Sequence, residues 1–255
     1  MHLTNHVYIL DGDLNIVGKL EDLASGEQIY SARFIGNKGY MVTFRQIDPL
    51  YVIDLSDPAN PKVLGFLKIP GVSDYLHPYD ENHVIGLGRD ATEEGRMQGM
   101  KLSLFDVTDV QNPTEVSKYM IGDRGTSSEA LNDHKAFLFS KEKNLLIIPV
   151  SLVEGEKWNA WNGVYVFSLD LENGFVLKGK VTHSNQTENE TDYYYNDYQS
   201  QIRRSLYMDD MLYTISQKMI KMNMLTDMAE INNVSLPYEE TVYPILYEEG
   251  VVSGI

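Results

Sequence analysis

The sequence predicts an all-β protein built from a repeated four-stranded unit. Short runs rich in Val, Ile, Tyr and Phe are separated by clusters of Gly, Pro, Asn and Asp, a pattern typical of strands joined by turns. Apolar residues almost never recur at the period of a helix. The units are also regularly spaced. Asp54 and Asp106 occupy equivalent positions 52 residues apart, and Phe105 and Phe167 occupy equivalent positions 62 residues apart.

The units follow one another along the chain, beginning with half a unit. The half unit has two strands, at residues 7–10 and 15–17, around a turn at residues 11–13. Each whole unit has two hairpins in succession, and the last of the four is the least regular. The strands of the whole units are expected at 32–35, 40–44, 50–55 and 62–67; 75–79, 83–87, 102–107 and 114–116; 136–139, 145–148, 164–167 and 175–177; and 205–207, 211–215, 219–222 and 228–231.

A four-stranded unit repeated head to tail cannot bury both faces of its sheet alone, and radial stacking of the units solves this problem. We therefore expect a β-propeller of four-stranded antiparallel blades, with four whole blades and one half blade. The half blade is placed at residues 1–22, the whole blades at about 30–70, 74–121, 134–182 and 202–236, and a C-terminal tail at 237–255.

The sequence allows two arrangements of the ends of this propeller. The tail has two candidate strands, at residues 241–247 and 251–253, which could complete the half blade and close a five-bladed ring. Alternatively the chain is an open arc of a larger propeller, with free blade edges through which it could self-associate. The sequence favours the open arc because Pro244 would interrupt the ladder of a closing strand.

Several segments resemble known families. Residues 51–65, Tyr-Val-Ile-Asp-Leu-Ser-Asp-Pro-Ala-Asn-Pro-Lys-Val-Leu-Gly, closely resemble the LVIVD repeat of bacterial and archaeal surface propellers, and residues 104–113 are a looser match. Other segments are similar to prokaryotic secreted proteins with a C-terminal β-propeller distantly related to WD repeats. These segments lie at 43–50, 73–82, 122–125 and 129–139. The resemblance implies a propeller outside the cell or on its surface. Because such proteins are usually about twice this length, it also implies the later part of a larger propeller.

Composition excludes several classes of partner. The net charge of −16, from 21 basic and 37 acidic residues, argues against a nucleic-acid partner, which would need a basic surface. The absence of cysteine excludes disulfides, thiolate metal sites and cysteine nucleophiles. The longest apolar stretch, residues 145–153, is too short for membrane insertion, which needs about 20 residues. No signal peptide is visible in residues 1–20, so an extracellular location is implied by the resemblance alone.

Most of the surplus length falls in one set of connections. Strands alternate in direction, so the connections between second and third strands emerge on the same face as those between blades; we call this the long-connection face. The connections expected there are 45–49, 89–100 and 153–163 within blades and 70–74, 122–133 and 182–200 between blades. Recognition tends to lie on loops held by a rigid scaffold, so we expect a ligand on this face.

Polar side chains on this face could form a mouth over the central channel that binds a sugar, a peptide or a divalent cation. They are Arg45, Asp48, Asp74, His77, Arg89, Asp90, Arg124, Glu129, Asp133 and His134. The alternative, which the sequence favours, is that Arg and Asp residues form ion pairs that hold neighbouring blades together. His77 and His134 are too few, and too distant in sequence, to indicate a zinc site, and no cofactor is expected.

Aromatic residues offer further candidates for ligand binding. Trp158 and Trp161 share one predicted loop and could stack on a carbohydrate, or they could fold down over their own hairpin as a small core. Tyr194 lies in a run of tyrosines and amides at 192–198, a composition found in adaptable recognition loops. A solvated insertion explains this run equally well.

Two functions remain open. The favoured hypothesis is a non-enzymatic extracellular propeller that binds a protein or a glycan through its long-connection face. The alternative is a carbohydrate-active or other hydrolytic propeller that uses Glu129, Asp133 and His134, because such chemistry leaves no local motif. Carboxylates paired with arginines would count against the alternative.

The predicted strands also specify which side chains pack between blades. We expect these side chains to be mostly buried: Phe34, Val42, Val52, Ile53, Val84, Phe105, Phe137, Ile147, Val166, Phe167 and Leu212.

Overall fold

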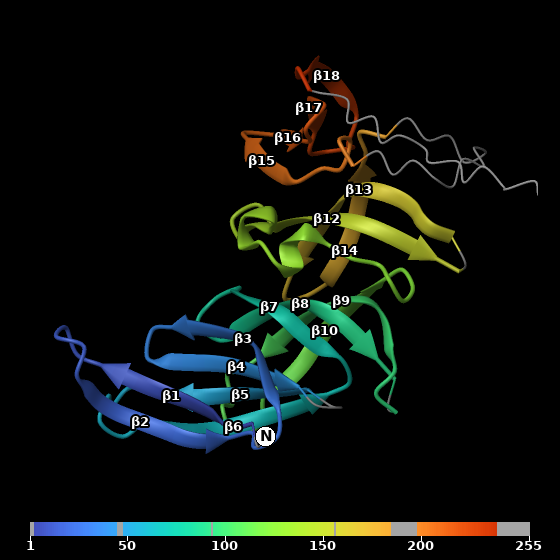
Figure 1. The fold of residues 1–255 in the computed structure, drawn as a ribbon. Helices are drawn as coiled ribbons and strands as arrows, with labels where there is room; N and C mark the ends of the chain where they lie inside the picture. Colours follow the sequence, from blue (N-terminus) through green and yellow to red (C-terminus); the bar gives the residue numbers. More distant parts are fainter. Residues whose placement is uncertain (1–2, 45–47, 93, 156, 185–197, 239–255) are drawn as a thin grey trace, which may run out of the picture.

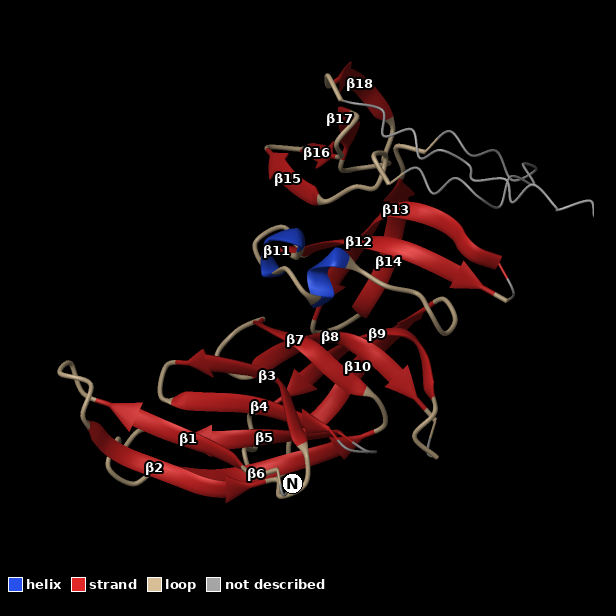
Figure 2. Ribbon diagram, in the orientation of Figure 1, coloured by secondary structure: helices blue, strands red, loops and turns tan. Residues whose placement is uncertain are grey.

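The computed structural model describes residues 3–44, 48–92, 94–155, 157–184 and 198–238. Nearly all regular structure in these ranges is β-strand, as Figure 2 shows. The strands form a two-stranded sheet and four four-stranded antiparallel sheets, each built in chain order. They are β1 (Asn5–Leu10) and β2 (Ile16–Leu23); β3 (Gln28–Ile35), β4 (Lys38–Phe44), β5 (Asp48–Asp54) and β6 (Lys62–Ile69); β7 (Val72–Pro78), β8 (His83–Ala91), β9 (Met97–Asp106) and β10 (Thr114–Ile121); β11 (Leu138–Ser140), β12 (Leu145–Glu154), β13 (Lys157–Asp170) and β14 (Gly174–Val181); and β15 (Arg204–Met208), β16 (Met211–Ile215), β17 (Met219–Met224) and β18 (Glu230–Ser235).

These sheets are the four blades and the half blade that the sequence predicts. We number the whole blades 1 to 4, from β3–β6 to β15–β18; β1 and β2 are the half blade. The sheets follow one another along an open arc, with the half blade at one end and blade 4 at the other (Figure 1). The candidate closing strands at 241–247 and 251–253 lie outside the described residues.

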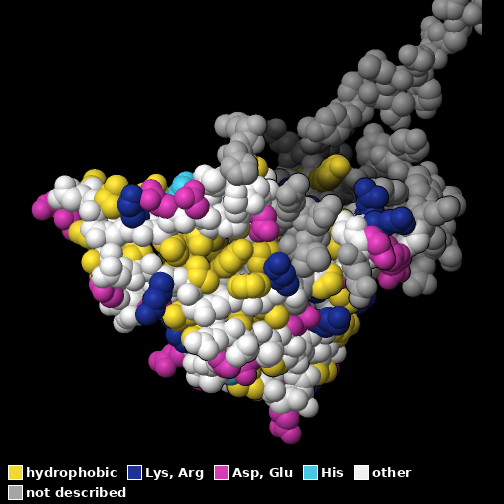
Figure 3. Space-filling view, turned by 90° about the horizontal axis from the view of Figure 1, so that it is seen from below, with side chains coloured by type: hydrophobic (Ala, Val, Ile, Leu, Met, Phe, Trp, Pro, Cys, Tyr) yellow, Lys and Arg dark blue, Asp and Glu magenta, His cyan; other side chains and the backbone are white. Residues whose placement is uncertain are grey.

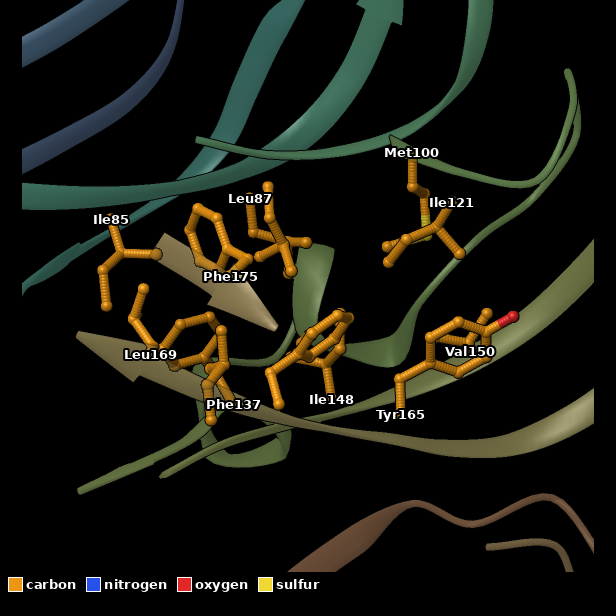
Figure 4. Close-up of a cluster of buried hydrophobic side chains, with 14 of the residues drawn as sticks. Ile85, Leu87, Met100, Ile121, Phe137, Ile148, Val150, Tyr165, Leu169 and Phe175 are labelled. Carbon is orange, nitrogen blue, oxygen red and sulfur yellow. The ribbon is translucent and has the colours of Figure 1, made fainter. Parts of the chain in front are cut away.

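Apolar side chains between the blades form the core. The largest cluster lies between blades 2 and 3, where β8 and β9 face β12 and β13 (Figure 4). Phe167, which is fully buried, belongs to this cluster, and the ring of Tyr119 meets it edge-on at 4.9 Å. Separate clusters join blade 1 to blade 2, blade 3 to blade 4, and the half blade to blade 1. Stacking of adjacent sheets therefore supplies most of the burial.

A small residue in the fourth strand allows each blade to approach the next. Each of these strands has a β-bulge. The residue after the bulge is Gly18 in the half blade, Gly65 in blade 1, Ser117 in blade 2 and Gly179 in blade 3. At each of these positions the turn between the third and fourth strands of the following blade comes into close contact. A β-carbon on Gly65 would overlap the backbone oxygen of Val110 and lie 2.8 Å from the Cα of Gln111.

We expect Gly65→Ala to lower the free energy of unfolding by about 2 kcal/mol, because the added methyl group meets backbone atoms that cannot rotate away. Urea denaturation measures the change. Gly12→Ala is the matched control, since nothing lies within 4 Å of a β-carbon built there. Equal stability of the two variants would contradict this account of blade packing.

Ten of the eleven side chains expected to be buried are 7% exposed or less, which confirms the predicted strand registers. Phe34 is the exception, because 62% of its surface is exposed. It lies on β3, the first strand of blade 1, on the side that faces the half blade. The half blade has only two strands and covers Met41 and Ile53 but leaves Phe34 open. The prediction for Phe34 was therefore wrong because it assumed a complete neighbouring blade.

Three of the predicted long connections are also wrong. Residues 89–100 and 153–163 are largely strand: β8 and β9 are joined by residues 92–96 alone, and β12 and β13 by residues 155 and 156. The connection predicted at 70–74 is only two residues long, because β6 ends at Ile69 and β7 begins at Val72. The ends of β8 and β9 extend beyond the first and fourth strands of blade 2, and the ends of β12 and β13 extend beyond those of blade 3. In each blade the two extended ends pair with each other as a two-stranded ribbon. A ribbon with solvent nearby accepts polar residues and glycine, so its sequence resembles that of a loop.

Candidate functional site

The connection from blade 2 to blade 3, residues 122–137, brings several candidate residues together. Its first part runs along β12: the N–H of Asp123 donates to the carbonyl of Val153 at 2.8 Å, and Ser127 and Ser151 exchange two backbone hydrogen bonds. Two short 3-10 helices follow, η1 (Glu129–Leu131) and η2 (His134–Ala136). The side chain of Asp133 caps η2 by accepting a hydrogen bond from the N–H of Lys135 at 2.9 Å.

The acidic candidates on this connection are paired with arginines from blade 4. Asp133 forms a hydrogen-bonded ion pair with Arg204, and Glu129 lies 3.5 Å from Arg203. The N–H of Lys135, reinforced by the Arg204 guanidinium, holds the pKa of the Asp133 carboxyl below its usual value. Asp133 therefore carries its charge at neutral pH and is a poor general acid, a role that needs a raised pKa.

Asp74 is paired as well, but within its own blade. Arg89 on β8 donates two hydrogen bonds to the two carboxylate oxygens of Asp74 on β7, at 2.8 and 3.2 Å. This fork-like geometry is the strong form of an arginine–carboxylate pair. It ties neighbouring strands together. Glu129 and Asp133 thus pair with arginines of a different blade, as the ion-pair interpretation expects, whereas Asp74 and Arg89 pair within one blade.

His77 is on β7, and its side chain lies among aromatic rings. Its ring is 4.9 Å from that of Phe137 and 5.4 Å from that of Phe139, and its Nδ1 is 2.9 Å from the hydroxyl of Tyr75. Burial, with a smaller contribution from the charge of Arg33, lowers the pKa of His77 to about 4. His77 is therefore neutral at pH 7, and it contributes to packing between blades 2 and 3.

The tryptophans lie on a strand and not on the predicted loop. Trp161 belongs to β13, packs against the core between blades 2 and 3 and meets Tyr165 edge-on at 5.5 Å. The ammonium group of Lys180 lies 5.4 Å from the centre of the Trp161 ring. A sugar stacked on this ring would compete with that lysine. Trp158 is also in β13, but its side chain is outside the described part of the structure.

The remaining candidates are scattered. Arg124 and His134 are exposed, and within the described ranges their side chains make no hydrogen bond or ion pair. Asp48 begins β5, and its side chain is not described. Arg45 and Tyr194 lie outside the described residues. In the described part of the chain, no group of three His, Asp or Glu side chains could hold a metal ion.

A buried lysine and a partly buried one were missed by the reasoning from sequence. Lys101 on β9 is 4% exposed, donates to the carbonyl of Pro70 at 2.7 Å and lies 3.7 Å from the carboxylates of both Asp90 and Glu115. Lys221 on β17 makes the corresponding contacts in blade 4, with the carbonyl of Thr182 and with Glu230 at 3.0 Å. A lysine in the middle of a largely apolar third strand was the signal available.

A buried histidine was also missed. His183 lies in the connection from blade 3 to blade 4 and is 3% exposed. Its ring nitrogens lie 2.9 Å from the hydroxyl of Ser216 and 2.8 Å from that of Thr214. Burial, reinforced by the charge of Lys221, lowers its pKa to about 4. A histidine and a serine this close could suggest a nucleophile, but the Ser216 hydroxyl also accepts from the N–H groups of Lys218 and Met219. These hydrogen bonds attach the connection from blade 3 to blade 4, through His183, to Thr214 and Ser216 of blade 4.

Comparison with known proteins agrees with this architecture. Residues 2–228 match a family described as "Beta propeller domain". The chain belongs to this family. The family match and the four blades confirm the propeller that the sequence resemblance implied.

Two archaeal proteins, both described as uncharacterised, are relatives of this beta propeller domain chain. It is 41% identical over 214 residues to a protein of Methanocaldococcus jannaschii, covering 84% of this chain and 29% of that protein. It is 42% identical over 175 residues to a protein of Archaeoglobus fulgidus, covering 64% of this chain and 27% of that protein. The chain thus spans less than a third of the length of these relatives. Among solved structures it aligns with the WD40 domain of Neurospora crassa Pan2, with 10% identity, a TM-score of 0.49, and coverage of 87% of this chain and 57% of that one.

Within the described ranges, no helix is long and apolar enough to cross a membrane.

Proposed function

We propose that this chain is a non-enzymatic propeller scaffold that binds a protein or a glycan through its long-connection face. The observation that supports this proposal is the pairing of the acidic candidates: Glu129 and Asp133 contact Arg203 and Arg204, and Asp133 also caps a helix. The hydrolytic alternative uses those two carboxylates together with His134. Asp133, which a guanidinium and a backbone N–H hold in its charged form, cannot readily deliver a proton to a leaving group.

The face also presents polar groups that are not used in the fold. Arg124 and His134 lie on the same connection, are exposed, and make no side-chain hydrogen bond or ion pair within the described part of the chain. The ribbons of β8–β9 and β12–β13 extend beyond their blades on this side. A rigid scaffold that displays such groups is the usual setting of a recognition surface. We place the protein outside the cell or on its surface, in line with the secreted and surface propellers that its sequence resembles.

The test is a comparison of binding and hydrolysis by the same protein. We expect the purified chain to retain members of an immobilised oligosaccharide panel, or proteins of the producing cell's surface, and to release no methylumbelliferone from a panel of methylumbelliferyl glycosides. Arg124→Ala combined with His134→Ala should weaken binding about tenfold. Lys62→Ala, an exposed site on the opposite face, is the matched control.

Glycoside hydrolysis that is abolished by Asp133→Asn would contradict the proposal and favour the hydrolytic alternative. Equal loss of binding in Lys62→Ala and in the double variant would place the ligand elsewhere.

A further inference from the structure

Arg33 is a partly buried arginine that has no partner within the described part of the chain. It lies on β3, and no hydrogen bond, ion pair or ring contact from a described residue holds its guanidinium group. The other partly buried arginines of these ranges each meet a carboxylate: Arg89, Arg203 and Arg204. The remaining described arginines, Arg96 and Arg124, are exposed to water. A guanidinium that is partly withdrawn from water without gaining a partner is costly, so Arg33 is the exception that needs a reason.

The side chain of Arg33 points toward blade 2. On β3, Ser31, Arg33 and Ile35 are partly buried and alternate with exposed residues. Ile35 packs against the core between blades 1 and 2, and the hydroxyl of Ser31 donates to the carbonyl of Ser73 on β7 at 2.7 Å. The first strands of the two blades therefore lie side by side (Figure 1). Arg33 thus faces the first strand of blade 2.

A pair of polar side chains on β7 lies within reach of the charge of Arg33. The hydroxyl of Tyr75 and Nδ1 of His77 form one hydrogen bond of 2.9 Å. The phenol and the neutral imidazole each bring one proton, so one proton stays outside this bond whichever tautomer His77 adopts. Burial lowers the pKa of His77 and raises that of Tyr75, and the positive charge of Arg33 lowers both. Among the described residues, no carboxylate contributes to either pKa, so these donors have no acceptor.

We propose that Arg33 and the Tyr75–His77 pair bind the carboxylate of an acidic sugar, such as a uronic acid unit of a glycan. This inference rests on the proposed binding function and names the group that is recognised. The two oxygens of a carboxylate match the fork of N–H donors on a guanidinium. The unused proton of the Tyr75–His77 pair supplies a further donor to the same group.

Charge and shape favour an isolated carboxylate on a sugar. One guanidinium balances one negative charge, whereas a phosphate monoester carries about two at neutral pH. The net charge is −16, and acidic side chains are spread around the face shown in Figure 3, so a ligand with many charges, such as an acidic peptide segment, is repelled. A glycan can carry a single uronic acid between neutral sugars. The partly buried rings of Tyr75 and Phe139, both close to His77, add apolar surface for the C–H groups of a sugar.

The first test compares probes that share a frame and differ in the carboxylate. By titration calorimetry, we expect the chain to bind methylumbelliferyl glucuronide about tenfold more tightly than methylumbelliferyl glucoside, because only the former offers a charged acceptor. N-acetylglutamate α-amide, which carries one carboxylate without a sugar, should bind more weakly than the glucuronide. Equal binding of the glucuronide and the glucoside overturns the proposal, and so does tighter binding of the amide.

The second test removes the guanidinium. Arg33→Gln should weaken binding of the glucuronide about tenfold, and Arg33→Lys, which keeps the charge without the fork, should recover only part of it. Lys118→Gln is the matched control, since it removes one positive charge from an exposed site on β10. Because Arg33 has no partner in the described fold, Arg33→Gln should not lower the midpoint of urea unfolding. A lower midpoint overturns the proposal, as does equal weakening of binding by Arg33→Gln and Lys118→Gln.

Variants at two places separate this site from the long-connection face. Retention of neutral glycans or of proteins that depends on Arg124 and His134 but not on Arg33 overturns the carboxylate site and leaves the scaffold function standing. Glucuronide binding that is lost in Arg33→Gln but kept when Arg124 and His134 are both replaced by alanine supports the carboxylate site. The same result contradicts the place proposed for the ligand.

Discussion

Lys101→Met should lower the free energy of unfolding by about 4 kcal/mol, the largest effect that we expect from a single substitution in this protein. The Lys101 ammonium group is almost completely buried and lies 3.7 Å from the carboxylates of both Asp90 and Glu115. Methionine fills a similar volume but leaves two partly buried carboxylates without a cation. Breaking such a group costs more than the pairing contributes, because the uncompensated charges stay buried.

A double-mutant cycle separates this effect from the loss of packing. Glu115→Gln in the Lys101→Met background should restore part of the stability, since it removes one of the two unpaired charges. Lys118→Met on the adjacent strand β10 is the matched control, because Lys118 is exposed. Urea denaturation of the wild type, Lys101→Met, Glu115→Gln and the double variant measures the coupling. A loss below about 1 kcal/mol in Lys101→Met would show that this buried group contributes little to stability.

The second large effect is a loss of stability in mild acid that depends on His183. Its pKa is about 4 in the folded protein, against an ordinary value of 6.5. Between these two pH values the unfolded chain binds more protons than the folded one, so the free energy of unfolding falls as the pH decreases. The contribution is complete above pH 6.5, and about 3 kcal/mol is lost by pH 4.

The difference between the wild type and His183→Gln isolates this contribution from that of the carboxylates. Glutamine can still hydrogen-bond to Ser216 and Thr214, but it does not titrate. We expect its free energy of unfolding to fall less between pH 7 and pH 4 than that of the wild type. His134→Gln, at an exposed histidine, serves as the control. Parallel pH profiles for the wild type and His183→Gln would refute the assignment of this acid sensitivity to His183. His77, whose pKa is also lowered to about 4, adds a second contribution of the same sign.

The sequence by itself determined the local structure of this protein. Each hairpin turn is encoded within a few residues. The carboxylates of Asp54, Asp106 and Asp170 accept hydrogen bonds from the N–H groups two residues later, at 2.8 to 2.9 Å, and so end a third strand and begin a turn. Alternating apolar residues then specified which side of each strand is buried, as the fully buried Val84, Ile147 and Leu212 show. Four repeats of such local signals were enough to predict the propeller.

Only the tertiary structure decided which surfaces have a neighbour and which charges have a partner. Phe34 has the same apolar, strand-forming character as Phe105, but it is exposed because the half blade covers only part of blade 1. Asp133 meets Arg204, which is 71 residues away in the sequence, because the blade 2–3 connection lies against the first strand of blade 4. Turn formation and strand alternation act over a few residues and can be read locally. Burial and ion pairing depend on how the blades are stacked, a relation between distant segments that no local pattern specifies.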